Sequence, residues 1–410
     1  MDQHVSQTML LLAVAMIVAI VARRVHLPYT VGLVVMGAIL TLSHTDVGAH
    51  LTHDLIYDLI LPPLLFEAAL SISWSELRRD AAPILALAVI GTVVAAATVA
   101  VGMTRLLGWP LASALVYGSL IAATDPVAII AMFKDNRIHG RIRLLVETES
   151  LMNDGAAAVL FAVTLGWVEA GGADQIGWDT FATLGRIVFG GVAVGAVCGG
   201  GAILLAGRAS EHVVEAALTT IAAFSSFLVA EHWRVSGVLA TVTAGLMMGN
   251  LGVLNAEDKS YLTVRGREFV VSFWEYAAFL ANSFVFLLIG IDIAGAAYDS
   301  YGPTLVVGAI AIALLGRALT VYPISLVFLW SRWIVTFPEQ HVLWWGGLRG
   351  ALGLALALSL PANLPMRDEI LIATFAVVGF SIVVQGLTMP PLMRQLGFLP
   401  KRVAPPAGEH

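Results

Sequence analysis

The chain has 410 residues, of which 59% are hydrophobic and only 12% are charged, with a formal net charge of −6. Soluble domains carry about 25% charged residues, so the composition excludes a protein whose main solvent is water. The single cysteine, Cys198, excludes an intrachain disulfide and lies in an apolar run, where it is expected to pack as a small apolar residue.

Apolar runs long enough to cross about 30 Å of hydrocarbon recur along the sequence and predict an all-α integral membrane protein. The first run follows a start without basic residues, and no small-residue cleavage site comes after it, which favours a retained helix over a signal peptide. Punctuation by Gly, Pro and charge places about thirteen spans at 7–23, 28–43, 54–73, 82–105, 111–134, 143–168, 181–206, 212–230, 235–251, 268–291, 303–330, 341–360 and 369–393. Together they predict a single membrane transport domain over 1–400 and a short polar tail at 401–410.

The distribution of Lys and Arg predicts the orientation in the membrane. With thirteen spans the two termini lie on opposite sides of the membrane. Sixteen of the 22 Lys and Arg residues then fall on the same side of the membrane as the C-terminus. Only Arg105, Arg234 and Arg367 fall on the other side. Because cytoplasmic loops carry the excess of positive charge, the N-terminus is expected outside and the C-terminus in the cytoplasm.

Small residues concentrate in the span predicted at 181–206. Glycines recur there between Gly190 and Gly201 and provide a face on which another helix can pack closely. The sequence leaves open whether this face forms a subunit interface or an internal contact.

The segment Ala122–Val127 interrupts the fifth span. Pro126 has no backbone N–H and disfavours helical dihedrals at Asp125, so the helix is expected to break or kink there. A break inside the bilayer is tolerated only where it faces protein or a water-filled cavity. Transporters build ion sites on such discontinuous helices, where exposed carbonyls and a side-chain charge meet. The alternative is a simple proline kink in which Asp125 caps the second half-helix, and such a cap is also compatible with an ion site.

The next span carries four polar residues within one and a half helical turns. Glu149 and Asn153 share one helix face, and Ser150 and Asp154 share the adjoining face. A carboxylate next to hydroxyl and carbonyl oxygens suits a monovalent cation such as Na⁺, and the same carboxylate can accept a proton instead. A purely structural role, in which the acids pair with buried arginines, remains open at this point.

Two arginines and a further acid also lie at membrane depth. Arg317 needs an acidic partner there, and Glu149 is the candidate. Arg349 follows two glycines in a segment that predicts a second unwound crossing. The two interruptions fall in the two halves of the chain, as expected of inverted repeats. Glu67 follows a Pro-Pro pair and is a further candidate for burial.

Five motifs, in order and at consistent spans, give the chain a resemblance to the monovalent cation:proton antiporter family. The sequence looks like its NhaP-type branch, which includes the animal sodium/proton exchangers. The motifs are LPPLLFEAAL at 61–70, ATDPV at 123–127, ESLMNDG at 149–155, GRALTVY at 316–322 and GGLRGA at 346–351. The resemblance implies a thirteen-helix fold with two inverted six-helix repeats, crossed discontinuous helices, a dimerisation domain and a mobile core domain.

The resemblance also implies a set of ion-binding residues. The family's ion-binding aspartate falls on Asp154, with Thr124 and Ser150 as the other oxygen donors to Na⁺ and Asp125 as a nearby acid. Asn153 matches the residue that marks the generally electroneutral branch, so one cation per proton is expected.

The stabilising acid–arginine pair of the family falls on Glu149 and Arg317, and Arg349 matches the arginine of the second crossing. Glu67 is grouped with these charge-compensating residues. The implied function is sodium/proton antiport across the plasma membrane by a homodimer embedded in lipid. Lithium is a second possible substrate, potassium/proton antiport is the main alternative, and a cation channel on the same fold is a weaker one.

No enzymatic activity is expected from the sequence. The histidines show no metal-ligand spacing such as HExxH, and no phosphate-binding loop or nucleophile–base arrangement is present. A membrane enzyme or receptor is therefore disfavoured, and neither catalytic residues, a cofactor nor a nucleic-acid partner is expected.

Overall fold

The structure is a computed structural model that describes residues 2–24, 27–43, 51–136, 138, 140–169, 178–209, 211–255 and 260–399. Every regular element within these ranges is a helix. The polar tail predicted at 401–410 lies outside the described residues.

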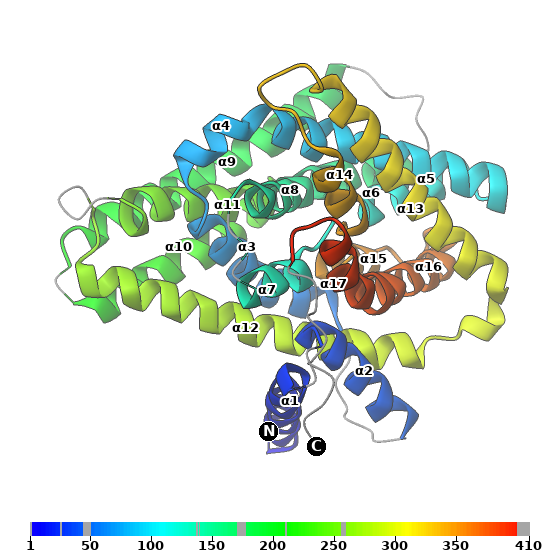
Figure 1. The fold of residues 1–410 in the computed structure, drawn as a ribbon, viewed down its shortest axis with the longest axis horizontal. Helices are drawn as coiled ribbons and strands as arrows, with labels where there is room; N and C mark the ends of the chain where they lie inside the picture. Colours follow the sequence, from blue (N-terminus) through cyan, green and yellow to red (C-terminus); the bar gives the residue numbers. More distant parts are fainter. Residues whose placement is uncertain are drawn as a thin grey trace, which may run out of the picture.

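The elements follow one another without strands between them in the described ranges (Figure 1). The first helices are α1 (Asp2–Arg24), α2 (Tyr29–Leu42), α3 (Leu61–Leu70), α4 (Trp74–Leu85), α5 (Gly91–Leu107), α6 (Leu111–Ile121), α7 (Val127–Asp135), α8 (Arg141–Glu169) and α9 (Trp178–Ala206). The later helices are α10 (His212–His232), α11 (Gly237–Met248), α12 (Val264–Gly295), α13 (Gly302–Val327), α14 (Phe337–Trp345), α15 (Ala351–Leu358), α16 (Arg367–Phe380) and α17 (Gly386–Gln395). Short π- or 3-10 segments are η1 (Leu55–Ile60), η2 (Ala86–Ile90), η4 (Gly249–Val253), η5 (Tyr298–Ser300) and η6 (Ser381–Gln385).

The helices suit a multi-pass membrane protein. Seven helical runs in the described part are long and apolar enough to cross a membrane, and four shorter helices are also apolar. Each of the predicted spans falls on helical elements of the structure, and two of them fall on shorter ones, η1 with α3 at 54–73 and α14 with α15 at 341–360. The number of crossings stays a prediction. At the fourth span the helix begins at Trp74 but is kinked at Asp80, whose backbone dihedrals are not helical, and the predicted start at 82 lies just after this kink. Its first turns are charged, with Glu76, Arg78 and Arg79, and therefore lack the apolar pattern of a span.

The helices pack in two groups, which lie on the left and right of Figure 1. Helices α3, α9, α10 and α11 contact one another, and α5, α6, α13, α15 and α16 form the second set of contacts. Helices α8 and α12 contact members of both groups. The two groups interleave along the chain, and the division into a dimerisation subdomain and a core subdomain stays a prediction.

The glycine-rich face of α9 makes an internal contact. A side chain at Gly191 or Gly195 would overlap the backbone carbonyls of Ser236 or Ala240 near and on α11, so only glycine allows this close approach. At Gly201, in contrast, a Cβ would meet no other atom within 4 Å. Of the two alternatives left open by the sequence, the structure shows the packing of this face within the chain.

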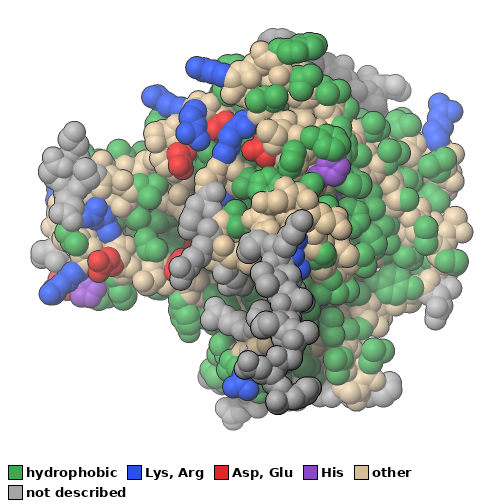
Figure 2. Space-filling model, viewed as in Figure 1, with side chains coloured by type: hydrophobic (Ala, Val, Ile, Leu, Met, Phe, Trp, Pro, Cys, Tyr) green, Lys and Arg blue, Asp and Glu red, His purple; other side chains and the backbone are tan. Residues whose placement is uncertain are grey.

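Large apolar side chains cover much of the exterior (Figure 2). Phe189, Val197 and Val327 are exposed by 76%, 74% and 77%, respectively. Lys and Arg gather mainly on the upper left and far left of the view, over α4 and the ends of α10 to α12. An apolar belt with charges at its ends is the surface expected of a protein immersed in lipid.

Candidate ion-binding site

Helices α6 and α7 are the two halves of the interrupted fifth span. Residues 122–126 between them are not helical, and Pro126 supplies no N–H to continue the ladder. Asp125 caps the second half-helix, because its Oδ1 accepts a hydrogen bond from the backbone N–H of Val127 at 2.9 Å. The predicted break is therefore present, and the carboxylate of Asp125 lies at the start of α7.

The second interruption separates α14 from α15 at residues 346–350. It contacts the first one directly, since the backbone N–H of Asp125 donates to the carbonyl of Leu348 at 2.7 Å. A Cβ on Gly350 would overlap the side chain of Asp125, so the two segments approach each other too closely for any other residue there. The two broken helices thus cross in the middle of the bundle (Figure 1).

Arg349 holds the end of the first half-helix. The residue is 4% exposed, and its guanidinium donates from Nη1 to the carbonyls of Ala122 and Ala123, each at 3.0 Å. These are unpaired carbonyls at the C-terminal end of α6, where a positive charge is favourable. No acidic side chain in the described part forms an ion pair with Arg349, so its hydrogen bonds go to a helix end.

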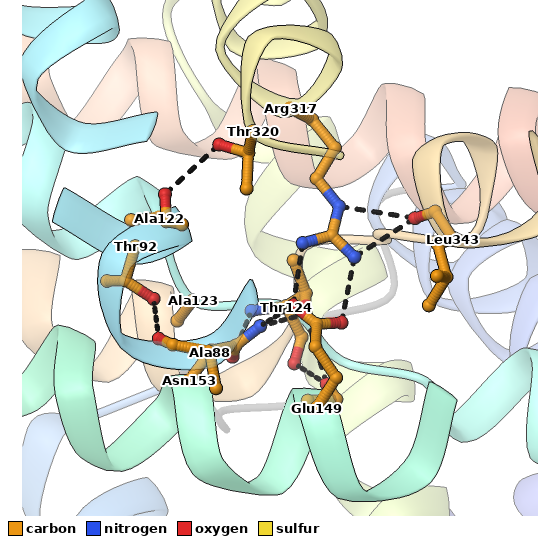
Figure 3. Close-up of polar contacts among 12 residues, drawn as sticks. Ala88, Thr92, Ala122, Ala123, Thr124, Glu149, Asn153, Arg317, Thr320 and Leu343 are labelled. Carbon is orange, nitrogen blue, oxygen red and sulfur yellow. Dashed lines mark hydrogen bonds and ion pairs between the residues drawn. The ribbon is translucent and has the colours of Figure 1, made fainter. Parts of the chain in front are cut away.

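Glu149 and Arg317 form a buried two-point ion pair (Figure 3). The two guanidinium nitrogens donate to the two carboxylate oxygens at 2.7 and 2.8 Å, and both residues are at most 5% exposed. Arg317 also donates to the carbonyl of Leu343 near the end of α14. The partner of Arg317 is thus the one that the sequence suggests, and the pair connects α8, α13 and α14.

Asn153 connects helix α8 to Thr124 in the first interruption (Figure 3), and Ser150 forms a second connection to the same residue. The Asn153 amide donates to the Thr124 hydroxyl at 2.6 Å and to Glu149 at 3.1 Å, and its oxygen accepts from the Thr124 backbone N–H at 3.2 Å. The Ser150 hydroxyl donates to the carbonyl of Thr124. These bonds hold Thr124 between α8 and the crossing.

A cavity of about 350 Å³ reaches the crossing. Among the polar residues that line it are Tyr29, Glu67, Thr124, Asp125, Lys134, Glu147, Asp154, Glu275 and Asn282. Asp154 accepts no hydrogen bond and forms no ion pair within the described part of the chain, unlike Glu149 one turn earlier on α8. A carboxylate at membrane depth that lacks a protein partner needs a cation, a proton or water.

Comparison with known proteins identifies the family. Residues 11–395 match the model of the sodium/hydrogen exchanger transmembrane family. The chain belongs to the sodium/hydrogen exchanger family. It is 38% identical to the Na⁺/H⁺ antiporter ApNhaP of Aphanothece halophytica, over 92% of this chain and 71% of that protein. It is 34% identical to the Na⁺/H⁺ antiporter NhaH of Halobacillus aidingensis, over 95% of this chain and 97% of that protein.

Solved structures support the fold of this exchanger-family chain. It matches the sodium proton antiporter MjNhaP1 of Methanocaldococcus jannaschii with a TM-score of 0.77 at 21% identity, covering 99% of both chains. A second structure of that protein, at pH 8, matches with a TM-score of 0.75. The resemblance seen in the five sequence motifs therefore extends to the whole arrangement of helices.

Not all of the residues predicted at the site of this exchanger-family chain line the cavity. Thr124, Asp125, Asp154 and Glu67 line it. Ser150 and Asn153 are 2% and 1% exposed, are not among its lining residues and bond to Thr124 instead.

Five polar lining residues were not predicted from the sequence: Tyr29, Lys134, Glu147, Glu275 and Asn282. Three of them are charged residues near predicted span ends, which resemble ordinary interface charges. Asn282 sits within an apolar span, and its Oδ1 is buried without a hydrogen-bond partner among the described residues. A polar amide in the middle of an apolar span is the one feature of the sequence that could have indicated Asn282 as a cavity residue.

Proposed function

We propose that this chain is a secondary active transporter that exchanges Na⁺ for H⁺, with Asp154 as the group that binds either ion. The observation that carries this proposal is the carboxylate of Asp154, which borders the cavity without a hydrogen-bond or ion-pair partner in the described part. Such a group is satisfied by a cation in one half of the cycle and by a proton in the other. The names of the relatives support the same exchange.

The neighbouring residues have distinct proposed roles. Thr124 and Asp125 border the same cavity and supply oxygens near Asp154. Ser150, expected as a direct ligand to Na⁺, bonds to the carbonyl of Thr124 and would join the ligands only after its hydroxyl turns away. Asn153 keeps Thr124 in place through its amide and carbonyl groups.

The paired and bonded charges supply the frame for the site. Glu149 and Arg317 neutralise each other, and Arg349 stabilises the end of α6. We propose that these three residues keep the crossing intact while the site moves between the two sides of the membrane. Glu67 borders the cavity, where Lys134 offsets its charge at 3.5 Å.

We propose an exchange of one cation for one proton. At the crossing Asn153 is neutral and Glu149 is paired with Arg317, so of the two acids that α8 places there Asp154 is the one left to change partners. A single carboxylate that carries Na⁺ in one direction and H⁺ in the other moves the same charge both ways. Exchange should therefore be insensitive to the membrane potential.

The membrane arrangement is also a proposal. We place the protein in the plasma membrane as a lipid-embedded homodimer, with the N-terminus outside and the C-terminus in the cytoplasm. The excess of Lys and Arg on the side of the membrane that holds the C-terminus supports this orientation. Li⁺ can replace Na⁺ in a site of this kind, and K⁺ is the alternative that has to be tested.

Cation-driven proton movement in sealed proteoliposomes tests the proposal. A lumenal pH dye reports exchange on addition of Na⁺, Li⁺ or K⁺, with the membrane potential clamped. We expect Na⁺ to move protons with the wild type and with Glu169→Gln, an exposed acid at the end of the same helix, and not with Asp154→Asn.

Each other outcome corrects a different part of the proposal. Exchange by Asp154→Asn with a normal pH dependence would reject Asp154 as the binding group. Exchange with K⁺ alone would change the substrate, and Na⁺ flux without proton movement would indicate a channel. If no cation moves protons with the wild type, the exchange itself is rejected.

A further inference from the structure

The outer part of the cavity is surrounded by charged residues that the proposed exchange does not use. Glu147 precedes Asp154 by seven residues on α8, which places it about 10 Å nearer the predicted cytoplasmic end of that helix. Lys134 lies at the C-terminal end of α7, toward the same side. Glu67 on α3 and Glu275 on α12 complete this group, which we call the cavity mouth.

Lys134 joins the walls of the cavity mouth. Its Nζ lies 3.5 Å from Oε1 of Glu67 and 3.6 Å from Oε1 of Glu275. It is the only Lys or Arg among the described residues that line the cavity. Three carboxylates and one ammonium therefore border the route from the predicted cytoplasmic side to Asp154.

We propose that Lys134 is a tethered cation that competes with incoming Na⁺ at the cavity mouth and so sets the apparent affinity for cytoplasmic Na⁺. This inference rests on the proposed exchange. A carboxylate-lined opening raises the local concentration of cations, and a positive charge fixed within it reduces that effect. The ammonium is a compact charge on a flexible stem, so it can leave Glu67 and Glu275 and return without a change in the backbone.

The ion pairs of Lys134 are exposed to solvent, which suits a side chain that competes with Na⁺ better than one that stabilises the fold. The side chains of Lys134, Glu67 and Glu275 are 43%, 23% and 56% exposed, whereas Glu149 and Arg317 are buried. Solvent screens exposed ion pairs, so these two contacts form and break readily. The site itself, by contrast, stays fixed by buried bonds.

The test is the apparent KM for Na⁺ at fixed pH in everted membrane vesicles, whose cytoplasmic face meets the medium. We expect Lys134→Gln to lower this KM about three- to fivefold at low ionic strength, since removal of one positive charge from the border of the ion path has an effect of roughly this size at intermediate dielectric. In about 0.3 M choline chloride the difference should shrink below about 1.5-fold. The maximal rate should stay within about twofold.

Matched variants separate charge from structure. Lys134→Arg keeps the charge and should keep the wild-type KM, and Lys134→Gln with Glu275→Gln should return it toward wild type. Glu275→Gln alone should raise it. Arg208→Gln, which removes a basic residue beyond α9 and outside the cavity lining, should have no effect.

An unchanged or raised KM in a well-folded Lys134→Gln, or a decrease that salt does not reduce, would overturn the inference. So would a Lys134→Arg variant that behaves like Lys134→Gln. If Lys134→Gln does not fold, the rise expected for Glu275→Gln decides the question. Absence of Na⁺-driven proton movement in the wild type would instead reject the proposed function, which keeps the two failures distinct.

Discussion

Helix α8 presents two acids in opposite surroundings. Glu149 faces Arg317, is 2% exposed and has both carboxylate oxygens bonded. Asp154 comes five residues later, borders the cavity and has no hydrogen-bond or ion-pair partner among the described residues. Both are carboxylates at membrane depth on one regular helix, so the residue type alone does not explain the difference. The neighbouring helices do.

Under the proposed function, this difference separates the acid that stabilises the fold from the acid that binds the transported ion. Arg317 neutralises Glu149 and ties α13 to α8, which makes that charge expensive to disturb. The two interruptions leave Asp154 beside a water-accessible space, where its partner can change. If this comparison is right, substitutions on the Arg317 side should mainly cost stability, and those on the cavity side should mainly cost exchange.

The largest effect on stability should come from breaking the buried pair. Arg317→Ala leaves the carboxylate of Glu149 buried and uncompensated, and should lower the free energy of unfolding by about 3–5 kcal/mol. Thermal unfolding in detergent measures this loss. Asp154→Asn, which we expect to lose exchange, should unfold at or above the wild-type temperature, because it removes a charge that has no partner among the described residues.

Two further variants test the cause of that loss. Arg143→Ala breaks the more exposed pair between Arg143 and Glu147 and should cost less than about 1 kcal/mol. Removing both buried charges, with Glu149→Gln and Arg317→Met, should recover part of the stability lost by Arg317→Ala. If the double variant is no more stable than the single one, the uncompensated charge is not the cause.

Much of the crossing could be predicted from sequence because backbone chemistry is local. Pro126 predicts a break wherever it stands in a span, and the glycines around Arg349 predict an unwound segment. The need of a buried arginine for an acid suggests Glu149 as the partner of Arg317. Each of these inferences depends on a few neighbouring residues or on a strong physical requirement.

The cavity could not be predicted in the same way, because its lining comes from distant parts of the chain. Lys134, Glu147 and Glu275 look like interface charges until α3, α7, α8 and α12 are brought together. The carbonyl groups that accept hydrogen bonds from Arg349 could not be predicted either, since no sequence pattern marks a helix end that binds an arginine. Spacing on one helix likewise placed Ser150 with Asp154 but could not show that its hydroxyl bonds to Thr124.

The crossing itself can be tested where its two segments touch. Gly350→Ala places a methyl group against the side chain of Asp125, and overpacking of this kind costs about 1–3 kcal/mol. If that strain displaces Asp125 in the transporting states, exchange should fall by about tenfold or more. Gly201→Ala is the matched control, because no atom lies within 4 Å of the added group. Equal activity of the two variants would show that the close contact at the crossing is not needed for exchange.

A third buried acid, Glu215, should have the smallest effect on exchange when it is substituted. It tests whether burial alone distinguishes Asp154 from other acids. Glu215 on α10 is fully buried and has no arginine partner among the described residues, yet its oxygens accept from the backbone N–H and the hydroxyl of Thr263 at 3.1 and 3.0 Å. It binds Thr263, the N-cap residue of α12, and is not part of the cavity lining. Glu215→Gln should cost about 1–2 kcal/mol of stability, because an amide can replace only part of these bonds. The apparent KM for Na⁺ and the maximal rate should stay at wild-type values in vesicles with matched amounts of folded protein. Loss of exchange in that sample would mean that burial of an acid, rather than its lack of a bonding partner, marks the residues that carry the ion.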